Sequence, residues 1–276
     1  MDWEELEFEY DAVGNGYVVT GVENDVIEDV DIPETYDDGE HGRHPVTDIG
    51  EGAFAGCKSL ESITIPAFVT SIGKKALNCI ALTEINVSEG NTSFKSIDGN
   101  LYGFDGTELI QYAIGKTESS FAIPDSVISI GFHAFGNCQL LENVTIPDSV
   151  ISIGDEAFTG CIALESITLP DSATSLGNMV FSNCWSLGKA TLSASLKTIG
   201  YAAFGFCDEL EEITIPKSVA SIGRMAFMGC DSLESAIFED PHGWSAGGGP
   251  LDLSDPERNA WLLSEYLISS ELARDD

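Results

Sequence analysis

The apolar positions of the chain recur in a unit of about 23 residues. The unit is clearest in Leu141–Cys161, LENVTIPDSVISIGDEAFTGC, and it returns with small changes from Leu164, Leu187, Leu210 and Leu233. Tandem copies of one unit stack on each other and bury a continuous core between them. The pattern therefore predicts a solenoid with a 23-residue repeat.

Each unit is predicted to contain two extended segments. The first is the triplet I-x-I, as in Ile63–Ile65, which alternates between inward and outward positions as a short strand does. A Pro often follows and ends the strand, because it has no N–H for the ladder. The second segment, Val-x-x-Ile, ends at a glycine that we expect to supply the unusual backbone angles of a turn. These glycines are Gly50, Gly73, Gly131, Gly154, Gly177, Gly200 and Gly223.

The motif Ala-Phe-x-x-Cys-x-x-Leu follows the second segment. Its spacing would place the apolar side chains on one face of a single α-helical or 3₁₀ turn. We therefore expect an α/β solenoid, in which short strands of neighbouring units stack in parallel about 4.8 Å apart.

Seven cysteines occupy one position of the repeat: Cys57, Cys79, Cys138, Cys161, Cys184, Cys207 and Cys230. An odd number cannot pair completely within the chain, and no zinc-type spacing occurs. The simplest interpretation is a column of buried thiols that pack as small apolar groups. Disulfides between neighbouring units and a metal site are the alternatives.

Residues 1–45 and 239–276 lack the repeat and are predicted to cap a solenoid over 46–238. In the first segment, Gly14–Gly16 indicates a hairpin and 35–44 a loop. Four further residues are expected to form an apolar cluster: Val26, Ile27, Val30 and Ile32. An enlarged variant unit at 88–120 contains a hairpin around GFDGTE, which is either an ordinary variant or a protruding contact loop. In the last segment, Ser254-Asp255-Pro256-Glu257 indicates a helix start, and one helix face would carry Ala260, Leu262, Leu263, Tyr266 and Leu267.

The repeat motif LxxIxIPxSVxxIGxxAFxxCxxL, matched most fully by Leu141–Leu164 and Leu210–Leu233, resembles the BspA-like subgroup of leucine-rich repeats. These repeats occur in bacterial surface proteins. The resemblance implies a right-handed leucine-rich repeat superhelix that serves binding and adhesion and has no catalytic centre.

The formal charge of −34 results from 46 acidic and 12 basic residues. It argues against binding to nucleic acids or anionic membranes, which require basic surfaces. A basic partner or a bound cation would fit, although a solvated acidic surface is the simpler interpretation. The start MDWEELEFEYD is not a signal peptide, and no apolar stretch is long enough to span a membrane. Either the chain stays inside the cell or a leader has been removed; the resemblance favours an extracellular or cell-surface location.

The chain carries no catalytic motif, and we expect no cofactor and no metal. His41 and His44 lie near acidic residues in an expected loop, and His133 occupies a variable position expected to be exposed. The turn Gly103–Gly106 resembles a calcium loop only superficially, because it lacks the series of aspartates.

Two outward columns are the candidate binding surface. The outward strand position holds Thr64, Asn86, Thr145, Thr168, Thr191 and Thr214, and the position after the repeat Leu holds Glu61, Glu142, Glu165, Glu211 and Glu234. From these columns the candidate surface takes Glu142, Thr145, Glu165, Thr168, Thr191, Glu211 and Thr214. It also includes Trp185 and Tyr201, two aromatic residues at variable positions of the repeat. Preference of Thr for strands and solvation of Glu explain the same pattern without a ligand.

We therefore expect a monomeric, non-enzymatic binding or adhesion module that recognises a host or bacterial surface protein or a glycan. A structural spacer that presents another domain is the alternative, and an enzyme is a remote one.

Overall fold

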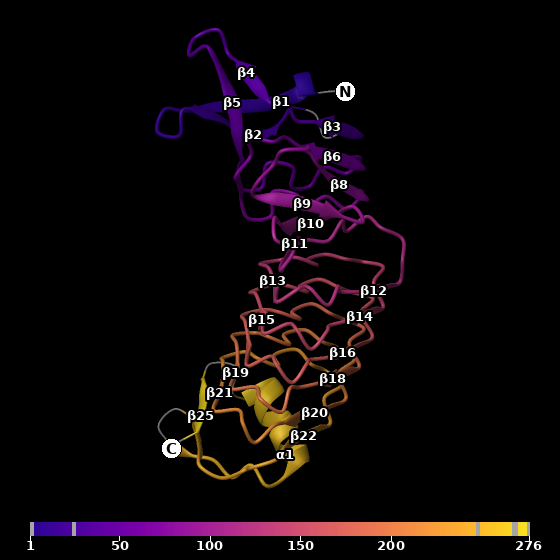
Figure 1. Cartoon of the computed structure of the whole chain (residues 1–276). Helices are drawn as coiled ribbons and strands as arrows, with labels where there is room; N and C mark the ends of the chain where they lie inside the picture. Colours follow the sequence, from indigo (N-terminus) through magenta and orange to yellow (C-terminus); the bar gives the residue numbers. More distant parts are fainter. Residues whose placement is uncertain (1–2, 24–25, 247–248, 267–269, 275–276) are drawn as a thin grey trace. The chain divides into compact units, whose positions relative to one another are not determined.

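The computed structural model describes residues 3–23, 26–246, 249–266 and 270–274. The chain forms two compact units, Met1–Lys116 and Thr117–Asp276. Each unit is a stretch of β-solenoid with little helix (Figure 1), and the two are described separately.

The first sheet of the second unit runs along the coils. It consists of six parallel strands in the order β12-β14-β16-β18-β20-β22. Their bounds are β12 (Ser120–Ala122), β14 (Asn143–Thr145), β16 (Ser166–Thr168), β18 (Lys189–Thr191), β20 (Glu212–Ile215) and β22 (Ser235–Phe238). Equivalent residues are in register, so Thr168 lies opposite Thr191. The predicted parallel stacking of I-x-I strands is confirmed.

The second extended segment of each coil forms a narrower parallel ladder. Its strands are β13 (Ser129–Ile130), β15 (Ser152–Ile153), β17 (Ser175–Leu176), β19 (Thr198–Ile199) and β21 (Ser221–Ile222). An antiparallel strand, β25 (Leu272–Arg274), pairs with β21 and covers the open edge of this ladder. Strands β23 (Trp244–Ala246) and β24 (Gly249–Pro250) extend it. Strand β25 was not predicted from the sequence.

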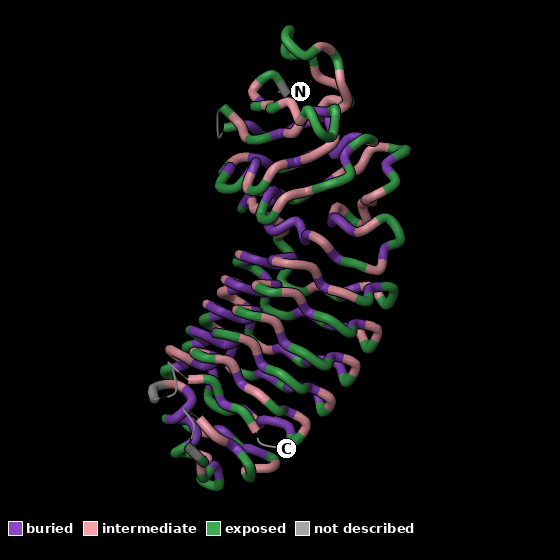
Figure 2. Tube along the Cα trace, turned by 90° about the vertical axis from the view of Figure 1, so that its left-hand side faces the viewer, coloured by how far each residue is buried: buried purple, intermediate pink, exposed green. Residues whose placement is uncertain are grey.

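The core lies inside the coils. Buried and exposed positions alternate in the same way along successive coils (Figure 2). The unit beginning at Leu141 buries the eight side chains Leu141, Val144, Ile146, Val150, Ile153, Ala157, Phe158 and Cys161. The phenylalanines of neighbouring coils stack, with ring centroids 4.7 Å apart for Phe135–Phe158 and 5.2 Å apart for Phe204–Phe227. Each stacked aromatic pair contributes about 0.5–1.5 kcal/mol to stability beyond the contribution of its buried surface area.

The Ala-Phe-x-x-Cys segment is not the helical turn that the sequence predicts. Ala157, Thr159 and Cys161 donate their N–H groups within the segment, whereas Glu156, Phe158 and Gly160 donate theirs to the next coil. A helix would use all of these N–H groups internally, so stacking of coils replaces helix formation here. Two residues per coil have positive φ, and these turn alternate N–H groups toward the next coil. The first precedes the Ala-Phe position and is His133, Glu156, Met179, Ala202 or Met225. The second precedes the Cys and is Asn137, Gly160, Asn183, Phe206 or Gly229.

The glycine after the second strand has a different role from the predicted one. None of these seven glycines has positive φ. A Cβ on Gly200 would instead lie 2.3 Å from the carbonyl oxygen of Gly177, and one on Gly223 would lie 2.6 Å from the backbone N of Tyr201. Glycine therefore recurs because neighbouring coils approach too closely for a side chain.

The first unit opens with the predicted hairpin, formed by β1 (Leu6–Asp11) and β2 (Gly16–Val22) after a short 3₁₀ turn, Trp3–Glu5. The prediction of a loop at 35–44 is wrong, because β4 (Thr35–Asp37) and β5 (Arg43–Ile49) pair as an antiparallel hairpin. Of the predicted apolar cluster, Ile27, Val30 and Ile32 are buried, but Val26 is 64% exposed.

The rest of the first unit is also built from stacked strands. One parallel ladder contains β3 (Asp29–Asp31), β6 (Ser62–Ile65) and β8 (Glu84–Val87). A second contains β2, β5 and β7 (Ser71–Ile72). The enlarged coil contains the predicted hairpin, with β10 (Asn100–Gly103) between β9 (Phe94–Ile97) and β11 (Glu108–Gln111). Of its aromatic side chains, Tyr102 and Tyr112 are buried and Phe104 is exposed.

The predicted helix near the C-terminus is confirmed as α1 (Pro256–Trp261). The carboxylate of its N-cap residue Asp255 accepts from the N–H groups of Glu257 and Arg258, and Pro256 occupies the first position. A π-helical segment, Leu262–Tyr266, continues α1. On the predicted face Ala260, Leu262 and Leu263 are buried. Leu267 and the side chain of Tyr266 lie outside the described part of the chain.

Candidate functional site

The outward strand positions of the second unit line two shallow grooves. Thr145, Thr168 and Thr191 are exposed, and Thr214 is half-buried. The first groove has a volume of about 540 Å³ and contains Thr145, Thr168 and Thr191. The second has a volume of about 610 Å³ and contains Thr191 and Thr214. Because the strands are in register, Thr168 and Thr191 lie side by side on the same face of the sheet. Thr64 and Asn86 occupy the equivalent positions of the first unit, in register on β6 and β8.

The carboxylates beside the grooves differ in part from the predicted ones. Asp148 and Asp171 line the first groove, and Glu211, Glu212 and Glu239 line the second. The two aspartates were not among the predicted residues, although both follow a Pro directly in the repeated P-D-S. That recurrence is the signal by which they could have been found. Hydroxyls flanked by carboxylates can accept hydrogen bonds from, and donate them to, a polar ligand.

The glutamate column lies at the start of the strands. Glu142 and Glu165 are exposed in neighbouring coils, with a 3.0 Å bond from the N–H of Glu165 to the carbonyl of Glu142. Gly188 takes the equivalent place in the following coil, since its N–H donates to the carbonyl of Glu165. The column is therefore interrupted there, and of its described members in this unit only Glu211 lines either of these two grooves.

The structure does not bring Trp185 and Tyr201 to these grooves. Trp185 is 51% exposed in the turn before β18, and Tyr201 is 40% exposed after β19. The hydroxyl of Tyr201 lies 3.2 Å from the sulfur of Met225 in the next coil. Neither aromatic residue lines either groove.

The histidines do not gather into a site. His133 is only 2% exposed, so the expectation of an exposed side chain is wrong. Its ring lies over Gly136, where an added Cβ would come within 2.1 Å of it. His41 contacts Asp38, with 2.7 Å between Nδ1 and the carboxylate, and stacks on Tyr10.

Within the described ranges, no group of three or more His, Cys, Asp and Glu residues is placed to hold a metal ion. In the same part of the chain, no helix has the length and apolar character required to cross a membrane. In the turn Gly103–Gly106, the carboxylate of Asp105 accepts from the N–H and the hydroxyl of Thr107.

A family model described as "BspA type Leucine rich repeat region (6 copies)" matches residues 42–111 and 111–234. No curated protein matches the chain.

Three solved structures illustrate the similarity. A leucine-rich repeat protein from Bacteroides ovatus is 26% identical, with a TM-score of 0.51 over 86% of this chain and 64% of that one. The pneumococcal vaccine antigen PcpA is 24% identical, with a TM-score of 0.63 over 77% of this chain and 57% of that one. A leucine-rich repeat protein from Eubacterium ventriosum is 28% identical, with a TM-score of 0.48 over 73% of this chain and 64% of that one.

The chain thus spans less than two thirds of each of these three relatives. The family model, in contrast, covers most of this chain, from residue 42 to residue 234. The chain belongs to the BspA-type leucine-rich repeat family.

Proposed function

We propose that the chain is a non-enzymatic binding or adhesion module, placed outside the cell or on its surface, that recognises a protein or a glycan. The binding face is the sheet β12–β22, and the chain acts as a monomer in which residues 1–45 and 239–276 cap the repeats. The observation that carries the proposal is the pair of grooves along Thr145, Thr168, Thr191 and Thr214.

Three features support this face. The strands are in register, so one polar group per coil repeats in the same direction along the sheet. Repeat proteins use such extended faces for recognition, because each coil adds surface without a new core. The family contains bacterial surface proteins, for which contact with proteins or glycans is an ordinary task.

The chemistry of the grooves also limits the ligands. Thr hydroxyls and carboxylates suit partners with many polar groups, such as sugar hydroxyls or peptide amides and basic side chains. Within the described residues that line them, Lys189 is the only basic one. An anionic ligand is therefore disfavoured.

The test is binding of the purified chain to a panel of immobilised extracellular-matrix proteins and glycans. Thr168→Arg places a bulky cation in the centre of the first groove, and Asp171→Lys reverses the charge at its edge. Thr174→Arg is the matched control, because Thr174 is exposed in the same coil but does not line a groove. Loss of a ligand in the first two variants alone is expected.

Two outcomes would contradict the proposal. Equal binding by Thr168→Arg and the native chain would exclude this face as the recognition surface. An absence of binding to the whole panel would instead favour the spacer, which presents another domain and has no ligand of its own.

A further inference from the structure

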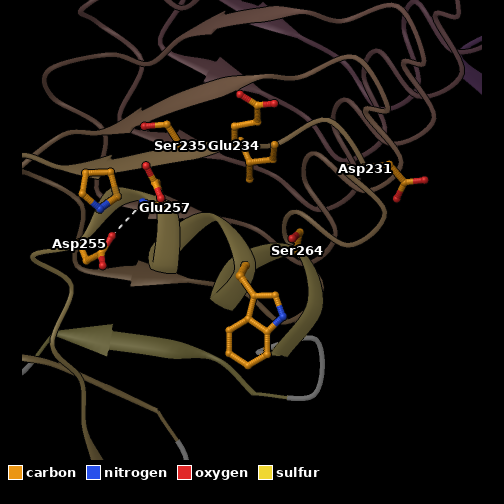
Figure 3. Close-up of a pocket in the computed structure, with 9 residues that line it drawn as sticks. Asp231, Glu234, Ser235, Asp255, Glu257 and Ser264 are labelled. Carbon is orange, nitrogen blue, oxygen red and sulfur yellow. Dashed lines mark hydrogen bonds between the residues drawn. The ribbon is translucent and has the colours of Figure 1, made fainter.

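A separate groove lies between the last coil and α1. It has a volume of about 790 Å³ and is lined by Asp231, Leu233, Glu234, Ser235, Asp255, Pro256, Glu257, Trp261 and Ser264. Asp255 and Glu257 lie at the start of the helix, with Glu234 and Ser235 on the coil beside it (Figure 3). None of its residues belongs to the grooves of the strand face.

The groove combines an aromatic surface with negative charge. Trp261 is 53% exposed, although its neighbours Ala260, Leu262 and Leu263 are buried against the solenoid. Three carboxylates, those of Asp231, Glu234 and Glu257, are on exposed residues. The carboxylate of Asp255 is already engaged as the helix cap. No lysine or arginine is among the nine described residues that line the groove.

Acidic side chains also accumulate beside the groove. Burial, followed by the nearby charges of Asp231 and Glu209, raises the pKa of Asp208, whose carbonyl accepts from Ser232 in the last coil. A cation bound at Asp231 would relieve this repulsion. The excess of acidic residues over the whole chain would further attract a cationic partner.

We propose that this groove binds an arginine-bearing peptide segment of a partner protein, with a guanidinium on the indole of Trp261 and its N–H groups on the carboxylates. Tryptophan is the best aromatic partner for a cation, and arginine stacks on it more often than lysine does. The planar guanidinium also donates pairs of hydrogen bonds to carboxylates, which an ammonium cannot do. The groove is larger than one side chain requires, so it accommodates flanking residues of the peptide.

The test is fluorescence anisotropy with a short labelled peptide that carries adjacent arginines and blocked ends. Matched peptides with lysine or glutamine in their place, and free spermidine as a competitor, separate a guanidinium from positive charge alone. The expected order of affinity is arginine above lysine, with no binding of the glutamine peptide. Inhibition by spermidine as strong as by the unlabelled arginine peptide would show a general polycation site and overturn the assignment.

Variants of the chain locate the site. Trp261→Ala should weaken binding of the arginine peptide about five- to thirty-fold, as expected for loss of a cation–π contact. Trp261→Phe should weaken it less, and Glu257→Gln should weaken it at low and moderate salt. Trp185→Ala and Glu165→Gln are the matched controls, since both residues are exposed in the same unit but outside the groove.

Circular dichroism and thermal unfolding establish that each variant is folded. If Trp261→Ala does not fold, Trp261→Phe and Glu257→Gln decide the question. The proposal would be overturned if either of these variants bound the arginine peptide with native affinity. It would also be overturned if the Trp185→Ala and Glu165→Gln controls lost as much affinity as the groove variants. Binding of a surface ligand to the strand face is measured separately with the Thr168 variant, so failure of one site leaves the other unaffected.

Discussion

The thiol of Cys161 donates to the carbonyl oxygen of Phe135, 3.1 Å away in the preceding coil. The same contact recurs between Cys184 and Phe158, between Cys207 and Phe181, and between Cys230 and Phe204. The recurring cysteine therefore does more than fill space. Its thiol is a second donor to a carbonyl that already accepts the N–H of the cysteine in its own coil, as Phe135 accepts from Cys138. All seven cysteines are buried, so the predicted burial of the column is confirmed, and all seven are free thiols in this structure.

The cysteines should be unreactive in the folded protein. Burial raises the pKa of the thiols of Cys138, Cys184 and Cys207, so little of the nucleophilic thiolate forms there. Burial also acts to raise the pKa of Cys161, but hydrogen bonds from Cys138 and Cys184 lower it to about 5, so its protection depends on its burial away from reagents. A colorimetric thiol reagent should find no rapidly reacting group in the native chain and seven after denaturation without reductant. Denaturation in the presence of a reductant is the control. Fewer than seven thiols in its absence would reveal a disulfide.

Replacement of Gly200 by Ala should strongly destabilise the second unit. The new Cβ would lie 2.3 Å from the backbone oxygen of Gly177, and the stacked coils cannot separate locally without loss of their hydrogen bonds. We expect a loss of about 2–3 kcal/mol in the free energy of unfolding, as for overpacking of a core. Gly188→Ala is the control, since its nearest neighbour would be the carbonyl oxygen of Glu209 at 3.5 Å. Equal denaturation midpoints for the two variants would refute this role of Gly200.

The repeat could be predicted from the sequence because its signals are local. Alternation in Ile213–Ile215 and the helix cap at Asp255 depend on residues close together in the chain, and both predictions are confirmed. The role of Gly200 could not be predicted, because it depends on the distance to another coil. The burial of His133 likewise depends on the space above Gly136.

The candidate site was predictable to a similar extent. Period-2 alternation is sufficient to place Thr145, Thr168 and Thr191 on the outer side of the strands. It does not show which carboxylates lie beside them, because Asp148 and Asp171 approach the groove through the turn after each strand. The groove at Trp261 had no signal in the repeat at all, since it forms between the last coil and a helix outside the repeat.

The residue with positive φ that precedes the Ala-Phe position of each coil provides a test of the turn geometry. Ala202 has φ of 47°, a conformation that costs an L-residue about 1–2 kcal/mol and costs glycine little. Ala202→Gly relieves this cost, but glycine also loses more conformational freedom on folding than alanine does. The free energy of unfolding should therefore stay the same or rise by up to about 1 kcal/mol. Ala194→Gly, at an exposed position without positive φ, should instead destabilise by about 0.5–1 kcal/mol. Chemical denaturation of both variants measures the difference, and an equal loss in both would contradict the assigned geometry.

The pair of Asp38 and His41 should make the first unit sensitive to pH. Backbone and side-chain hydrogen bonds from His41 hold the pKa of Asp38 well below its usual range. The hydrogen bond to Asp38 in turn raises the pKa of His41. The contribution of Asp38 to stability is thus present above its ordinary pKa of 3.8 and is lost as the pH falls through its folded value. That of His41 is present below 6.5 and is lost as the pH rises through its folded value.

The effect of Asp38→Asn on the unfolding temperature should therefore be largest between about pH 4 and pH 6.5 and smaller at pH 8. Titration of the His41 ring by NMR should show that the same substitution lowers its pKa, because the hydrogen bond to the carboxylate is what raises it. Glu40→Gln removes the same charge next to His41 without removing that bond, so it should shift the titration much less. An equal shift in both variants would mean that the net charge of the loop, and not the contact with Asp38, controls His41.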